Sequence, residues 1–180
     1  MTEDNDWVLS GVSQVAEMMG LAAVTAPKSK GENYVVVKIL QGPPVQELAR
    51  TMIAFGERSR KANFDRDARN VAGSQAVVLI GLEEPNTLGL NCGACGYPTC
   101  DELLDQLPYQ GEFIGPMCAF RLLDLGIALG SAVKTASLFN VDNRIMYRIG
   151  AAARQMGLVD WHFVMGVPLS VSGKSIFFDR

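Results

Sequence analysis

The chain has 180 residues, enough for one domain with a buried core and short for two, so we expect a single domain over residues 1–180. Hydrophobic residues make up 48% of the chain and charged residues 19%, a composition that excludes an intrinsically disordered protein. The net charge is −3, the start at 1–6 is acidic and unlike a signal peptide, and no apolar run is long enough to span a bilayer. We therefore expect a cytoplasmic protein that binds neither nucleic acid nor membrane.

The first half of the chain predicts two helices and two strands. Apolar residues at helical spacing predict a helix over 7–25, which a proline ends. A strand is expected at 34–40, and Gly42-Pro43-Pro44 opens a second helix. The mixed charges at 57–70 indicate a solvated helical face rather than a binding patch. The continuous apolar run at 75–82 predicts a central strand that is buried on both faces.

The most apolar helix of the second half is predicted over 116–139. Gly126 and Gly130 lie about one turn apart in it, and small residues at this spacing allow another helix or a second subunit to approach closely. Since glycine costs a helix roughly 1 kcal/mol relative to alanine, close packing is the expected compensation. Either a neighbouring helix or a second subunit could supply this packing, and we expect the protein to be a homodimer.

The last forty residues predict one more helix and two strands. Either Asn140 or Asp142 can cap a helix that runs to Met156. A strand at 161–170 and a short terminal strand at 176–178 follow. Helices and strands thus alternate without repeats or linkers, which favours an α/β (α+β) fold in one layered domain, with helices around a central sheet.

All four cysteines of the chain lie within a segment at 88–120, which we interpret as a cysteine-rich insertion in this domain. They are Cys92, Cys95, Cys100 and Cys118. Their spacing is Cys-x2-Cys-x4-Cys, followed by seventeen residues before the last. Four thiolates can hold either a tetrahedral zinc ion or a [4Fe–4S] cluster. Disulfides are not expected, because nothing in the sequence resembles a secretory signal.

The local sequence around the cysteines favours the cluster over zinc. Zinc sites usually pair two short cysteine knuckles, whereas here three candidate ligands share one loop and the fourth stands alone. Thr99 and Glu102 form a capping box that places Cys100 at the first position of a helix. Gly115-Pro116 predicts that Cys118 also lies in a first helical turn. Two helix N-termini would stabilise an anionic cluster, and we expect residues 108–115 to form a loop over it.

The segment 92–100 resembles the Cys-x2-Cys-Gly-x3-Cys motif of the small [4Fe–4S] domain in Rnf-type electron-transport subunits. The large subunit of the corrinoid iron–sulfur protein carries a similar motif, and there too a fourth cysteine follows about this far downstream. Nearly the whole chain also resembles a family of bacterial and archaeal proteins described as containing a ferredoxin domain. The segments that carry this wider resemblance are 22–28, 88–92, 124–133, 141–147 and 175–180. It implies the cluster and the fold rather than a reaction.

The order of elements resembles the nitroreductase-type flavoprotein fold. The flavin-phosphate signature of that fold, an Arg-Arg-Ser-type run, is missing; residues 10–14 stand in its place, and Lys28 stands where the fold usually has serine. If FMN is bound, the resemblance implies that its neighbours come from three parts of the chain: Lys28, Asn33, Asp142, Asn143, Arg144 and Lys174.

Three functions stay open at this point. The favoured one is a [4Fe–4S] redox protein that carries single electrons to an unknown redox partner protein. The alternative is a flavin-dependent oxidoreductase in which the cluster feeds an FMN held between two subunits. The third is an interaction protein with a structural zinc ion. The only histidine, His162, lies in an apolar strand and is interpreted as structural, so no residue is assigned a catalytic role.

Overall fold

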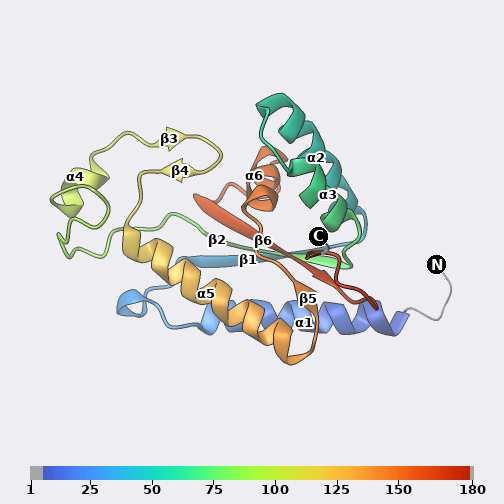
Figure 1. Ribbon diagram of the computed structural model, residues 1–180. Helices are drawn as coiled ribbons and strands as arrows, with labels where there is room; N and C mark the ends of the chain where they lie inside the picture. The colour runs from blue at the N-terminus through green and yellow to red at the C-terminus, as the bar shows by residue number, and fades with distance from the viewer. Residues whose placement is uncertain (1–5, 179–180) are drawn as a thin grey trace.

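The structure is a computed structural model that describes residues 6–178, and its centre is a four-stranded antiparallel sheet with helices on both faces (Figure 1). The strand order is β1 (Val35–Gln41), β2 (Ala76–Leu82), β6 (Phe163–Ser170) and β5 (Asp142–Asn143). One face is covered by α1 (Asp6–Thr25) and α5 (Ala119–Leu138), and the other by α2 (Pro43–Ser59), α3 (Phe64–Ala72) and α6 (Tyr147–Gln155). At one end of the sheet lies a lobe with α4 (Cys100–Leu104), β3 (Tyr109–Gln110) and β4 (Ile114–Gly115).

Strand β2 organises both layers of the core. Every residue of β2 is buried, and successive side chains point to opposite faces of the sheet. Val78 and Ile80 pack with α1 and α5, whereas Val77 and Leu79 pack with α2, α3 and α6. Because β2 lies between β1 and β6, the prediction of a central strand buried on both faces is confirmed.

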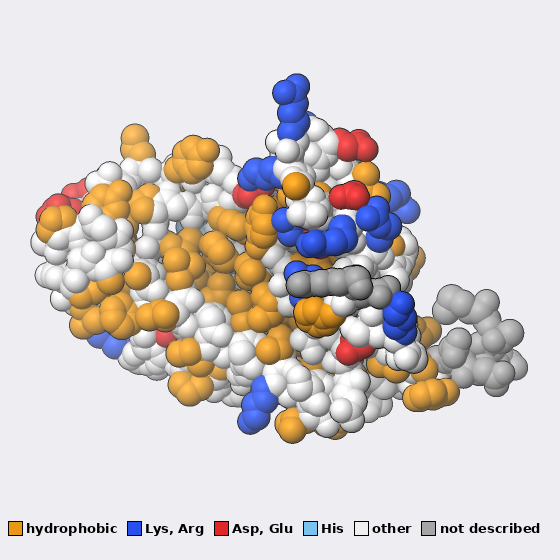
Figure 2. Space-filling model, in the orientation of Figure 1, with side chains coloured by type: hydrophobic (Ala, Val, Ile, Leu, Met, Phe, Trp, Pro, Cys, Tyr) orange, Lys and Arg blue, Asp and Glu red, His pale blue; other side chains and the backbone are white. Residues whose placement is uncertain are grey.

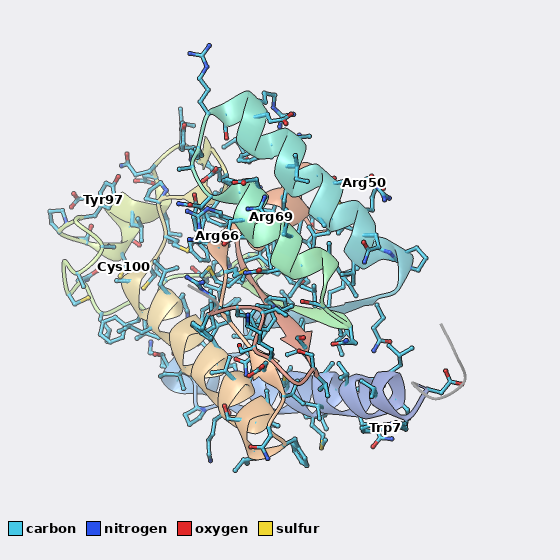
Figure 3. All side chains as sticks on the ribbon, turned by 45° about the vertical axis from the view of Figure 1, so that its right-hand side comes forward. Trp7, Arg50, Arg66, Arg69, Tyr97 and Cys100 are labelled. Carbon is cyan, nitrogen blue, oxygen red and sulfur yellow. The ribbon has the colours of Figure 1, made fainter. Side chains whose placement is uncertain are left out.

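Helix α1 is one of two 20-residue apolar helices on its face of the sheet. In the part of the chain that the structure describes, it is the one helix long and apolar enough to cross a membrane. Core helices of globular proteins have the same length and composition, and α1 buries Val12, Ala16 and Met19 against the sheet and α5. Its outer face exposes Trp7, which Figure 3 labels, and Leu21.

Two expectations for the last forty residues are wrong. Neither Asn140 nor Asp142 caps a helix, because Asp142–Asn143 forms the edge strand β5 and α6 begins only at Tyr147. No strand forms at 176–178 within the described residues, since both sides of β6 are already paired, with β2 and β5. Phe177 of this segment is buried instead in the core under α2 and α6.

The glycines of α5 do not contact a neighbouring helix. Gly126 and Gly130 lie on the exposed side of α5, and apart from the neighbouring backbone of α5 itself nothing described in residues 6–178 would come within 4 Å of a Cβ added at either. The contact with α1 uses the opposite side of α5, through Leu125, Ala128 and Leu129. The expectation of a close helix within the chain is therefore wrong, while a second subunit on this face stays a prediction.

Two helical glycines should respond to alanine in opposite directions. In Gly150→Ala the new Cβ would lie 1.8 Å from the backbone oxygen of Val164, so α6 must move off β6. We expect the free energy of unfolding to fall by about 1–3 kcal/mol, the usual cost of overpacking. In the control Gly126→Ala nothing obstructs the Cβ, and we expect a gain of about 0.5–1 kcal/mol. Urea unfolding measures both; equal effects would contradict the packing of α6 on β6.

Candidate metal centre

The cysteines lie in a lobe with a small apolar cluster of its own. The chain leaves the sheet after β2, turns through α4 and returns by the β3–β4 hairpin to α5, so the lobe projects beyond the end of the sheet (Figure 1). Its cluster is separate from the two cores of the sheet and contains Leu88, Leu103 and Cys118, with Cys95, Tyr97 and Phe120 packed around them. The fourth candidate ligand is thus part of the packing that holds the lobe together.

All four cysteines line one recess, whose free volume is about 10 Å³. They differ in exposure: Cys92 is exposed, Cys95 and Cys100 are half-buried, and Cys118 is buried. Figure 3 labels Cys100 and Tyr97, which lie on the same lobe. The structure therefore brings together the four residues that the spacing predicted.

The local sequence positions the two cysteines at helix starts as expected. Thr99 is the N-cap residue of α4: its Oγ1 accepts a hydrogen bond from the Glu102 N–H at 3.2 Å and donates one to Glu102 Oε1 at 3.0 Å. Cys100 is consequently the first residue of α4. Cys118 is the N-cap residue of α5, one position before its first turn.

Asn91 is a functional residue that the sequence reading missed. Its backbone is left-handed (φ 48°), and its Oδ1 accepts a hydrogen bond from the Cys100 N–H at 2.8 Å. Because the Asn91 N–H donates to Cys100 Sγ at 3.4 Å, the pKa of the Cys100 thiol lies below its ordinary value. A lowered pKa favours the thiolate, the form that binds metal. Asparagine tolerates left-handed backbone, so its place beside Cys92 in a glycine-rich loop was the available signal.

Two groups could take the four thiolates, a zinc ion and a [4Fe–4S] cluster. One zinc ion with Zn–S bonds of about 2.3 Å requires four sulfur atoms about 3.8 Å apart. Within residues 6–178, no three Cys, His, Asp or Glu groups lie close enough together to hold one metal ion. A [4Fe–4S] cluster takes each thiolate on a different iron. Four thiols that line one recess, three of them from one loop, supply the soft ligands that such a cluster needs.

Asn91 provides a test of the loop geometry. Asn91→Ala removes the acceptor of the Cys100 N–H and disfavours left-handed backbone, so we expect about 10- to 100-fold weaker retention of the metal group, as for other outer-shell partners. Asn91→Gly keeps the backbone conformation and should lose less. The measurement is the rate of colour loss under a chelator; equal rates in wild type and both variants would contradict a role for Asn91.

A buried ion-pair network anchors the lobe to the rest of the molecule. The Arg121 guanidinium is fully buried and donates to the carbonyl oxygen of Asn86 at 3.0 Å, to that of Ser29 at 3.2 Å and to Asp124 Oδ2 at 3.2 Å. It also pairs with Glu32. Asp124 accepts two further hydrogen bonds, from the backbone N–H and the hydroxyl of Ser29, both at 2.8 Å. The only sequence signal was a charged pair three residues apart in an otherwise apolar helix.

The segment 108–115 does not cover the cysteines, and that expectation is wrong. It forms the β3–β4 hairpin, whose backbone N–H at Ile114 donates to the carbonyl oxygen of His162 at 2.8 Å. The Phe113 ring stacks on Phe163 with centroids 4.2 Å apart. The hairpin therefore joins the lobe to the sheet. His162 has the structural role expected, since its Nδ1 accepts a hydrogen bond from the Glu84 N–H at 3.2 Å.

One chain does not bring the six candidate flavin neighbours together. Lys28 and Asn33 precede the start of β1, whereas Asp142 and Asn143 pair with the end of β6 at the other end of the sheet. A strand of this length spans about 20 Å. The Lys28 ammonium is also engaged, because it donates to the carbonyl oxygens of Ala23, Val24 and Ala26 at 2.6–3.0 Å.

The remaining two candidates lie with the second group. Arg144 follows β5, and its guanidinium donates to the carbonyl oxygen of Phe177 at 3.1 Å. Lys174 is exposed in the turn after β6. A flavin that touched all six residues would have to lie between two subunits.

Sequence comparisons match two parts of the chain to known families. A family model described as an uncharacterized protein containing a ferredoxin domain matches residues 114–180. A second model, for a proposed Fe–S cluster, matches residues 89–107 and so covers the first three cysteines. A protein from the archaeon Archaeoglobus fulgidus is 46% identical over 181 residues, which cover 100% of this chain and 97% of the relative.

Solved structures confirm the expected fold. The FMN-dependent nitroreductase NfnB from Mycobacterium smegmatis aligns with a TM-score of 0.60 at 9% identity, over 93% of this chain and 82% of its own. A nitroreductase with bound FMN from Desulfitobacterium hafniense aligns with a TM-score of 0.57 at 11% identity, over 89% and 78% of the two chains. At such low identity the likeness establishes the nitroreductase-type fold and nothing about a ligand.

Proposed function

The chain belongs to the family of ferredoxin-domain proteins, and from this premise we propose that it is a redox protein whose [4Fe–4S] cluster carries single electrons to a partner protein. The observation that supports this proposal is the recess lined by Cys92, Cys95, Cys100 and Cys118, the first three of which lie in the match to the family model for a proposed Fe–S cluster. When bound there, the cluster would supply reversible one-electron transfer.

The residues of the chain would perform three tasks around that group. The loop of 91–100 would supply three thiolates and hold Cys100 by the two hydrogen bonds from and to Asn91. Cys118 would supply the fourth from the rigid start of α5. The apolar side chains of Leu88 and Leu103 would exclude water from the buried side of the recess, while Cys92 stays exposed at its mouth. An exposed ligand gives electrons a short path to a partner.

The experiment that tests this function is metal and sulfide analysis of protein purified without oxygen. We expect about four irons and four sulfides per chain, as [4Fe–4S] requires, with a broad absorbance that bleaches on addition of dithionite. One zinc ion per chain and no colour would overturn the redox function and leave a structural or interaction role.

The second candidate function is a flavin-dependent oxidoreductase in a homodimer. The likeness to FMN-dependent nitroreductases supports it. It requires two subunits, because one chain keeps the six candidate neighbours apart. The Lys28 ammonium already donates to carbonyl oxygens at the end of α1 and just after it, which weighs against a phosphate bound to Lys28. An oxidised-flavin absorbance band in the purified protein would favour this function, and a spectrum with only the iron–thiolate band would favour the electron carrier.

A further inference from the structure

The charge of the chain is divided unequally between the cysteine lobe and the body. Residues 70–120 contain six of the 19 Asp and Glu residues and none of the 16 Lys and Arg residues. This segment therefore carries −6, and the rest of the chain carries +3. In Figure 2 acidic side chains mark the outer edge of the lobe, at the left, whereas most Lys and Arg side chains in view gather over α2 and α3.

Half of the acidic residues of this segment lie on one short helix or directly after it. Asp101 and Glu102 of α4 and Asp105, its C-cap residue, are all exposed; we call them the acidic tip. Apolar side chains flank it, with Leu107 91% and Tyr109 75% exposed. The cations that reach the lobe contact other parts of it: the Lys30 ammonium donates to the carbonyl oxygen of Leu88 at 2.7 Å, and Lys61 pairs with Glu112 of the hairpin at 2.9 Å.

We propose that the acidic tip, with its flanking apolar residues, is the docking surface for a redox protein that presents a basic face. The proposal rests on the proposed function and specifies the partner's chemistry. Charges on one face steer an oppositely charged partner and raise the association rate by about 10- to 1,000-fold. Complexes that transfer electrons bury little area, so a surface the size of α4 and its neighbours is sufficient.

Other occupants are disfavoured by the same charges. A symmetric dimer through the acidic tip would bring the same three carboxylates of both subunits together, because such an interface uses one patch twice. Like charges across an interface are repelled. Nucleic acid and anionic lipid headgroups are negative and would be repelled as well. A positively charged protein remains, and the lobe presents Cys92 to it at the same end of the molecule.

The test uses the iron-loaded protein and ferric cytochrome c, a basic haem protein, as the probe. Asp101→Asn/Asp105→Asn removes two charges from the acidic tip without changing side-chain shape. Glu57→Gln/Asp160→Asn, whose side chains are exposed on the body, is the control with the same change in net charge. Sedimentation velocity measures the dissociation constant. Stopped-flow absorbance measures the transfer of one electron from the dithionite-reduced protein to the ferric haem, which becomes ferrous with no proton taken up.

We expect the tip variant to bind cytochrome c about tenfold more weakly and to pass electrons more slowly by a similar factor, while the control stays within about twofold of wild type. Raising the ionic strength from about 0.01 M to 0.15 M shortens the Debye length from about 30 Å to 8 Å and should remove most of the difference. Equal weakening in both variants would overturn the docking surface. The proposal would also be overturned if the wild-type protein formed a dimer and the tip variant did not, because a second copy of the chain would then occupy the acidic tip. Failure of the proposed function would be recognised separately, because the purified protein would then contain no iron.

Discussion

Cys118→Ser is expected to lose the metal group while the apoprotein stays as stable as wild type. Cys118 is the buried N-cap residue of α5 and its side chain caps nothing. Serine is among the favoured N-cap residues, so its hydroxyl can accept a hydrogen bond from the first turn of α5. It cannot replace a soft thiolate as an iron ligand. Iron retention should therefore fall by more than the roughly 10- to 100-fold that loss of an outer-shell partner costs.

The measurement is iron and sulfide content after purification without oxygen, together with thermal unfolding of the apoproteins. Ala119→Ser is a matched control, because it adds a hydroxyl at the next position of α5 and removes no thiolate. It should keep its full iron content. Full iron content in Cys118→Ser, and in each of the other three cysteine variants, would refute the ligand assignment.

The sheet and its main helices were predictable because their sequence patterns are long and uniform. The apolar run at 75–82 has no polar residue to place on a solvent face, and it became the fully buried strand β2. The helical spacing over 7–25 became α1, whose end at Thr25 precedes Pro27 as expected. The strand direction was not predictable, since an apolar run alone does not say which neighbours it will pair with.

The errors fall where a short segment depends on a distant one. Asp142 has the composition of a cap, but Ser170 lies opposite it, and pairing with β6 decides its conformation. The sequence predicts residues 108–115 as a loop over the cysteines, whereas Phe113 in this segment stacks on Phe163. Neither contact can be predicted from the residues next to it in the sequence.

The candidate site was predictable for its ligands and not for their support. Four cysteines at a specific spacing leave few alternatives, so the ligand set could be proposed from sequence. Asn91 and Arg121 act through contacts that only the fold creates: Asn91 reaches nine residues along the loop, and Arg121 gathers groups from three separate segments. The periodicity of apolar residues predicts helices and strands, but it does not predict the conformation of a loop or an ion pair between distant segments.

Arg121→Met is expected to lower the free energy of unfolding by about 3–5 kcal/mol, the usual cost of breaking a buried ion pair on one side. The substitution removes the guanidinium that pairs with Asp124, a buried carboxylate that is only 3% exposed. The carbonyl oxygens of Asn86 and Ser29 lose their donor as well. Domains of this kind are stable by about 5–15 kcal/mol, so the loss is severe. Arg121→Lys keeps the charge with fewer donors and should be less destabilised. Urea unfolding measures both variants.

A double substitution separates the charge from the anchoring of the lobe. If the unpaired carboxylate causes the loss, Arg121→Met/Asp124→Leu should be more stable than the sum of the single effects by about 1–3 kcal/mol, the range for residues in direct contact. If the carbonyl contacts dominate, the effects add, because Asn86 and Ser29 stay without a donor in either case. Hydrogen exchange of the backbone amides of residues 86–100 tests whether Arg121 also holds the cysteine loop against α5. If it does, these amides should exchange faster in Arg121→Met, while the amide of Leu79 in β2 exchanges as in wild type. Unchanged exchange together with unchanged stability would contradict the network.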